Sequence, residues 1–155
     1  MKAYAFKTND LGKTWTNIIP NDDVTGFTRN IQEDYVNKDL LFLGTELGLY
    51  ITINGGDKWS KFTKNVPPVA IHYIELQTNT NDLVMGTHGR GVIIIDDISP
   101  LREINETNLS NKLYFFKRDK FEIQEFGGFA DNFGRETQFI GANSSLSCQI
   151  QYLRL

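Results

Sequence analysis

Short apolar runs alternate with polar turns along this chain, and the 3.6-residue period of an amphipathic helix is scarce. The runs are rich in β-branched and aromatic residues and are bounded by Gly, Asn and Asp, as is typical of strands. The pattern predicts strands at 4–7, 15–18, 28–33, 40–44, 49–53, 59–62, 71–77, 83–86 and 92–96. One short helix is expected at 99–104, with Ser99 as its N-cap and Pro100 at its first helical position. The sequence therefore predicts an all-β chain.

The strands fall into repeated units. LFLGT at 41–45 recurs as LVMGT, GLYI at 48–51 recurs as GVII, and Trp15 recurs as Trp59, each about 42 to 44 residues later. A period of 40 to 50 residues with several short strands is typical of the blades of a β-propeller. We therefore expect a partial β-propeller of about two and a half four-stranded blades, followed by an extended linker and a lone C-terminal strand. The corresponding domains are 1–98 for the blades, 99–136 for the exit turn and linker, and 137–155 for the start of a truncated β-sandwich.

A propeller closes with four to eight blades, so a partial ring leaves strand edges unpaired. Two expectations follow. Either the chain is a piece of a longer protein whose other blades are missing here, or it self-associates through its open edges. A truncated product without a function of its own is a third alternative.

One turn is repeated together with its flanking strand and its tryptophan. TNDLGKTW at 8–15 returns as TINGGDKW at 52–59, with Asn54 in place of the aspartate and Lys58 in place of the second threonine. We expect Asp10 to accept hydrogen bonds from its own turn, Gly12 to supply a positive φ, and Trp15 to be buried between neighbouring units. The residues to which we assign a structural role are Thr8, Asp10, Gly12, Thr14, Trp15, Thr52, Asn54, Gly56 and Trp59.

The first copy resembles the Asp box (BNR repeat) of sialidases, oligoxyloglucan hydrolases and sortilin-type receptors. In those families the boxes lie away from the ligand face, so the resemblance implies that Asp10 is a turn residue and not a catalytic carboxylate. Further along, GTELGLYITINGGDKW, DLVMGTHGRGVIIIDDISPL and FIGANSSLSCQIQYLRL resemble, in this order, bacterial glycosyl-hydrolase-like proteins with a sortilin-like propeller. This second resemblance implies an exported, periplasmic or extracellular protein whose propeller binds a peptide or a glycan.

In a meander, successive turns alternate between the two ends of the sheet, so the turns at 45–47 and 87–90 lie opposite the Asp-box hairpins. This places Glu46, His88 and Arg90 as the ligand-binding candidates. An arginine can clamp a carboxylate through two hydrogen bonds, and a histidine can exchange protons near neutral pH. The structural alternative is that Gly89 and Gly91 serve a tight turn while Arg90 pairs with Asp96, with Asp97 or with a neighbouring blade. His72 lines a central channel or is a core histidine.

A glycoside hydrolase is the alternative function. Its usual chemistry needs two carboxylates about 5 to 9 Å apart, or a tyrosine with a glutamate in sialidases. Glu46 is the sole acid in a turn at the ligand end, and Asp22 and Asp23 lie in a loop that leads to a strand. Only Arg29 and Arg90 are placed to meet a substrate carboxylate. Catalytic residues would therefore lie mostly in other blades, and no catalytic residue is assigned.

Composition and charge limit the classes of binding partner. The chain has 155 residues and a formal net charge of −3, so nothing favours nucleic acid, and no apolar run approaches the about 18 residues of a membrane span. No signal peptide is visible at the N-terminus, and no cofactor or metal site is predicted. The single cysteine, Cys148, is expected to be an inert strand residue, and the glycine–aromatic segment at 122–136 a flexible connector.

Overall fold

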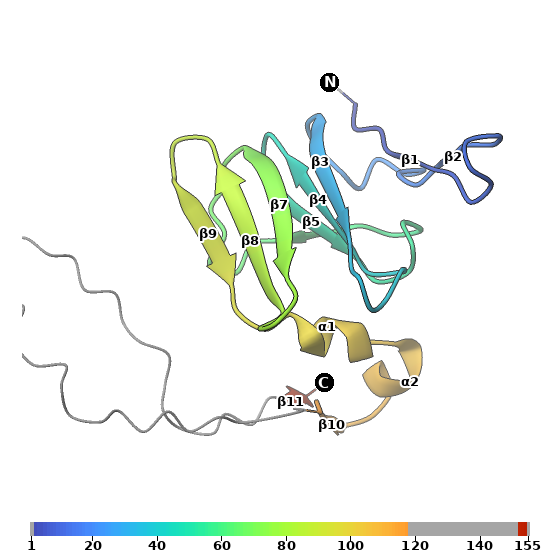
Figure 1. Cartoon of the computed structure of the whole chain (residues 1–155). Coiled ribbons are helices and arrows are strands. Elements are labelled where there is room, and N and C mark those ends of the chain that lie inside the picture. Colours follow the sequence, from blue (N-terminus) through green and yellow to red (C-terminus); the bar gives the residue numbers. More distant parts are fainter. Residues whose placement is uncertain (1, 118–151, 155) are drawn as a thin grey trace, which may run out of the picture.

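The structure, a computed structural model, describes residues 2–117 and 152–154 (Figure 1). It consists mostly of short antiparallel strands with two short helices, which confirms the prediction of an all-β chain. The strands are β1 (Phe6–Lys7), β2 (Thr16–Asn17), β3 (Thr28–Glu33), β4 (Leu41–Thr45), β5 (Gly48–Thr52), β6 (Ser60–Phe62), β7 (Ile71–Gln77), β8 (Asp82–Thr87), β9 (Val92–Ile95), β10 (Leu113–Phe115) and β11 (Tyr152–Arg154). The helices are α1 (Ser99–Glu103) and α2 (Glu106–Leu109).

Each sheet is a meander, because strands that follow one another in the chain also pair in space. The order is β3-β4-β5-β6 in a four-stranded sheet and β7-β8-β9 in a three-stranded sheet, while β1 and β2 form a separate hairpin. The predicted order of strands is therefore confirmed for the part of the chain up to β9. In the residues that the structure describes, no sheet closes on itself.

The sheet β3–β6 lies between the hairpin β1–β2 and the sheet β7–β9 (Figure 1). Its two central strands, β4 and β5, are buried along their whole length, which fits strands covered on both faces. We call one side of this sheet the Tyr50 face, which comprises Leu41, Leu43 and Tyr50. The opposite side, the Phe42 face, comprises Phe42, Leu49 and Ile51.

Each face belongs to its own hydrophobic cluster. The Tyr50 face packs with Trp59 against the N-terminal segment, through Ala3, Ile18, Ile19 and Val24. The Phe42 face packs against the next sheet, through Ile71, Ile74, Leu76, Leu83 and Met85. The sheets are therefore stacked, and the burial of apolar side chains between them holds the stack together.

Helix α1 begins one residue away from the expected cap. The helix includes Ser99, its N-cap position is Ile98, and no side chain caps it. The prediction of Ser99 as the N-cap is therefore wrong, because the Ser99 hydroxyl hydrogen-bonds to the Asp97 carboxylate instead. The prediction of a helix with a proline in its first turn is confirmed.

The C-terminal strand is not alone. β11 pairs antiparallel with β10, so that Leu113 lies opposite Arg154 and Phe115 lies opposite Tyr152. The expectation of a lone C-terminal strand is therefore wrong, because residues 113–115, for which no strand was predicted, pair with it. The connector at 122–136 and Cys148 lie outside the described residues.

Candidate functional site

The turns β4–β5 and β8–β9 lie at the same end of their sheets and are built alike. The Thr45 hydroxyl donates a hydrogen bond to the carbonyl of Gly48 at 3.0 Å, and the Thr87 hydroxyl donates to the carbonyl of Gly91 at 2.7 Å. The residue after each threonine, Glu46 or His88, donates a backbone hydrogen bond to the segment that precedes the first strand of the same sheet. These bonds run from the Glu46 N–H to the Phe27 carbonyl (3.4 Å) and from the His88 N–H to the Ala70 carbonyl (2.9 Å).

A β-bulge brings one more polar side chain of each first strand to this end. The register shifts between Thr28 and Asn30 in β3 and between Ile71 and Tyr73 in β7, so Arg29 and His72 are the extra residues. Bulges often re-aim a side chain near a site. The His72 ring stacks on that of His88, with 5.6 Å between ring centroids and an interplanar angle of 18°. The bulge residue His72 therefore connects β7 with the β8–β9 turn by stacking on His88.

Arg90 is exposed beside this pair of histidines. The described residues provide no ion pair or side-chain hydrogen bond to its guanidinium, and the expected partners Asp96 and Asp97 do not meet it. Gly89 and Gly91 both have positive φ, at 84° and 67°, which confirms that they serve a tight turn. A Cβ added to either glycine would meet nothing within 4 Å, so the space beside the backbone of both glycines is open.

Glu46 is partly buried and folds over a glycine of the preceding loop. A Cβ at Gly26 would lie 3.0 Å from Cγ and 3.3 Å from Oε1 of Glu46. Within the described part of the chain, its carboxylate takes part in no ion pair. No group of three or more His, Cys, Asp and Glu side chains suited to a metal occurs among the described residues. Of the three predicted candidates, Glu46 thus lies in the neighbouring turn, and His88 and Arg90 share one turn.

Arg29 takes a different role from His72, although both are bulge residues. Its guanidinium lies 4.6 Å from the centroid of the Phe27 ring, a cation–π contact. The same end of the stacked sheets therefore carries two arginines and two histidines, contributed by both sheets. Positive side chains at one end can receive a carboxylate, a sulfate or a phosphate.

At the opposite end, the repeated turns are closed networks of hydrogen bonds. Asp10 accepts from the Thr8 hydroxyl at 2.9 Å, from the Thr14 N–H at 2.8 Å and from the Thr14 hydroxyl at 2.7 Å. These bonds, led by that of the Thr14 hydroxyl, lower the pKa of Asp10 from 3.8 to about 2. The carboxylate is thus committed to its own turn, which leaves it poorly suited to acid–base catalysis near neutral pH.

The second turn copies the first. Thr52 donates from its hydroxyl to Asn54 Oδ1 at 2.7 Å, and Asn54 Oδ1 accepts from the Lys58 N–H at 3.1 Å. The Gly56 N–H donates to the Thr52 hydroxyl, as the Gly12 N–H does to that of Thr8. Gly12 has a φ of 90°, so the predicted role of this glycine is confirmed.

The two tryptophans have different surroundings. Trp59 is 4% exposed, and its indole N–H donates to the carbonyl of Ile18 at 2.7 Å. Trp15 is 60% exposed, and its indole N–H donates to the carbonyl of Gly12 in its own turn. The expectation that Trp15 is buried is therefore wrong. Trp59 has the hairpin β1–β2 to pack against, whereas no described segment lies on the corresponding side of Trp15.

A buried ion pair, which the sequence did not reveal, ties α1 to the two sheets. Arg102 donates from Nε and Nη2 to the two carboxylate oxygens of Asp34, both at 2.9 Å, and from Nη1 to Asn81 Oδ1 at 2.7 Å. Its guanidinium also lies 4.7 Å from the centroid of the Tyr35 ring. Burial acts to lower the pKa of Arg102, but the hydrogen bonds with Asp34 and Tyr35 outweigh it and raise that pKa. These contacts join α1 to the turns that follow β3 and β7.

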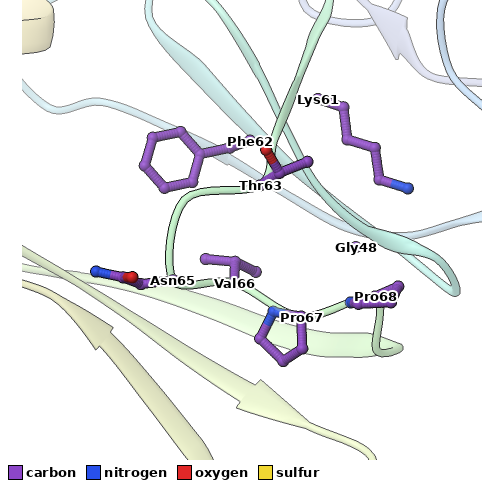
Figure 2. A pocket seen from close by; sticks show the side chains of 8 residues that line it. All are labelled: Gly48, Lys61, Phe62, Thr63, Asn65, Val66, Pro67 and Pro68. Carbon is purple, nitrogen blue, oxygen red and sulfur yellow. The ribbon is translucent and has the colours of Figure 1, made fainter.

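An apolar groove of about 560 Å³ runs beside β6 and is shown in Figure 2. Its lining residues are Gly48, Lys61, Phe62, Thr63, Asn65, Val66, Pro67 and Pro68. Lys61 is the sole charged side chain among them, and its ammonium lies 5.8 Å from the centroid of the Tyr50 ring. The groove holds no acid or base pair that could carry out catalysis.

Comparison of the chain with protein-family models, with curated proteins and with solved structures found no match. In the residues that the structure describes, no helix is long and apolar enough to cross a membrane.

Proposed function

We propose that this chain is part of an Asp-box β-propeller that acts as a non-catalytic binding scaffold. Its ligand, a peptide or a glycan, is bound through an anionic group at the end of the sheets that carries Glu46, His88 and Arg90. The observation that carries the proposal is the stacked pair His72–His88 beside an exposed Arg90 that has no ion pair with any described residue.

Several features support a propeller as the scaffold. The units repeat at about 42 to 44 residues, each sheet is a meander, and the bulge, the threonine turn and the hairpin turn recur at equivalent positions. A blade shares these traits, and blades stack face to face around a channel.

The chemistry of the two ends supports binding instead of catalysis. Asp10 is held ionised by its own turn, with a pKa of about 2, and is not free to exchange a proton. No described residue forms an ion pair with Arg90, and an arginine presents a planar fork that matches a carboxylate. The open glycines on both sides allow a ligand to approach the backbone closely.

Nuclear magnetic resonance titration tests the proposal. The probes are a short peptide with a free C-terminal carboxylate, its C-terminal amide, and sialyllactose as an acidic glycan. We expect shifts at His72, His88 and Arg90 with a carboxylate-bearing probe, and a loss of affinity of about tenfold or more in Arg90→Gln, because a charge-assisted hydrogen bond is removed.

Lys58→Gln is the matched control, since it removes one positive charge at the opposite end of the sheets. An equal loss of affinity in Arg90→Gln and Lys58→Gln would show that only the net charge matters. That result would contradict the proposed site. Hydrolysis of the glycan that is abolished in Glu46→Gln would favour the glycoside hydrolase instead.

A further inference from the structure

The outer face of the sheet β7–β9 carries exposed apolar side chains, and Glu75 lies exposed among them. Tyr73 is 74% exposed, Val92 64% and Ile94 55%, and Val84 is partly buried. These four residues, which we call the β9 patch, lie in two adjacent cross-strand rows, Tyr73–Gly86–Val92 and Glu75–Val84–Ile94. Neighbouring exposed apolar side chains bordered by a polar residue, here Glu75, indicate an interaction site.

The β9 patch is the repeat equivalent of the Phe42 face. Val84, Val92 and Ile94 occupy the positions that Phe42, Leu49 and Ile51 have in the middle sheet, about 42 to 43 residues earlier. The registers agree, because Val84 pairs with Ile94 as Phe42 pairs with Ile51. In the middle sheet this face is fully covered by the next sheet.

A second uncovered patch lies at the other end of the stack. Tyr4, Phe6 and Trp15, which we call the hairpin patch, are each more than half exposed. Phe6 and Trp15 are the repeat equivalents of Tyr50 and Trp59, and Phe6 pairs with Asn17 as Tyr50 pairs with Lys61. The hairpin patch is therefore the equivalent of the Tyr50 face.

The chain itself shows how these two kinds of face fit together. The middle sheet packs its Tyr50 face on the hairpin β1–β2, and the sheet β7–β9 packs with Leu83 and Met85 on the Phe42 face. Leu83 and Met85 are the repeat equivalents of Leu41 and Leu43. At both internal contacts, a Tyr50-type face thus meets the unit that precedes it. Each free patch of this chain is one half of such a contact.

We propose that the hairpin patch of one molecule docks on the β9 patch of a second copy of this chain. The contact is heterologous, because two different surfaces meet, so it can extend to a ring or to a linear chain of molecules. A second copy is the proposed occupant because it carries the complementary face, as the internal contacts pair these two kinds of face. The proposal is independent of the ligand site, which lies in the turns at the end of the sheets.

The contact is small. An aromatic side chain buries about 150 to 250 Å² when it is fully covered, and the three in the hairpin patch are already nearly half covered. The interface is therefore near or below the low end of specific interfaces, which total about 1,200 Å². We expect association that depends on concentration in the micromolar range, and not a permanent oligomer.

Sedimentation velocity over about 1 to 100 µM tests the proposal. The mean mass of the full chain is expected to rise with concentration. Phe6→Glu in the hairpin patch and Ile94→Glu in the β9 patch should each raise the dissociation constant by at least about tenfold, because each places a charge in an apolar contact. Leu11→Glu is the control, since Leu11 is fully exposed but belongs to neither patch, and it should associate like the unchanged chain.

Mixing the two variants separates a heterologous contact from a symmetric one. The Phe6→Glu chain keeps an intact β9 patch and the Ile94→Glu chain keeps an intact hairpin patch, so a mixture should form one-to-one dimers although neither variant associates alone. Trp15→Ser and Val92→Ser form a second, milder pair in case a glutamate disturbs folding, which circular dichroism reports.

A chain that stays monomeric over the whole range overturns the proposal. So does association that survives in either glutamate variant, or a mixture that stays monomeric while the unchanged chain associates. Loss of carboxylate binding in Arg90→Gln with association intact would leave this inference standing, so the two proposals fail separately.

Discussion

At the scale of single residues, the same motif gives the same local geometry but not the same burial. Asp10 and Asn54 are held in their turns by equivalent bonds. Trp15 and Trp59 differ because only Trp59 has a described neighbour to cover it. A sequence motif therefore predicts the turn that its own residues form, but not the surface against which that turn packs.

The two tryptophans form a matched pair for a stability test. We expect Trp59→Ala to lower the free energy of unfolding by about 3 to 5 kcal/mol, because it empties a buried site and removes the bond to the Ile18 carbonyl. Trp15→Ala should cost less than about 1 kcal/mol, as is usual for an exposed position. Urea denaturation measures both, and similar losses would contradict the packing described for Trp59.

The Asp10 carboxyl should titrate at a pKa of about 2, well below 3.8. Because the folded-state pKa is the lower one, Asp10 stabilises the fold above pH 4, and this contribution is lost as the pH falls towards 2. Thr14→Val removes the strongest hydrogen-bond donor and should bring the pKa back towards 3.8, whereas Thr14→Ser should keep it low. Carboxyl chemical shifts followed with pH report the value, and an unchanged pKa in Thr14→Val would contradict the assigned cause.

At the scale of elements, the order of the strands could be read from the alternation of apolar and polar positions, and the bounds of β3 and β7 were predicted to the residue. The period of the repeat also gave the positions of the turns. Three features of the structure could not be predicted from the sequence. The pairing of β11 with β10, the stacking of His72 on His88, and the pair Asp34–Arg102 all join segments whose separation in sequence carries no local signal.

The pair Asp34–Arg102 is expected to hold α1 against the turns β3–β4 and β7–β8. Asp34 is fully buried and accepts four hydrogen bonds, two of them from the backbone N–H groups of Val36 and Asn37. Asp34→Ala should therefore cost about 3 to 5 kcal/mol of unfolding free energy, because Arg102 loses its buried partner.

The exposed pair Lys2–Asp22 provides the comparison. Its atoms are 3.1 Å apart, yet Asp22→Ala should cost less than about 1 kcal/mol, because water screens both charges. A thermal or urea transition in which the two aspartate variants lose similar stability would show that burial does not give Asp34–Arg102 its strength.

At the scale of the whole molecule, the described sheets form a stack of like units. Each sheet is too thin to shield its own apolar side chains, so stability comes from the contacts between neighbours. Position in the stack then decides whether a face is covered. The Phe42 face is covered, and its equivalent on β7–β9 is open.

Gly44 and Gly86 test this stacking most directly, because they are repeat equivalents that differ in what faces them. A Cβ at Gly44 would lie 2.9 Å from the backbone oxygen of Ile71 in the next sheet, whereas a Cβ at Gly86 would meet only the Tyr73 Cβ at 3.7 Å. Neither glycine has a positive φ, so alanine alters the unfolded chain equally at both positions. The decisive measurement is the unfolding free energy of the two variants by urea denaturation at low protein concentration. The stacked arrangement predicts a loss of about 1 to 3 kcal/mol for Gly44→Ala and no loss for Gly86→Ala. Equal effects in the two variants would contradict it.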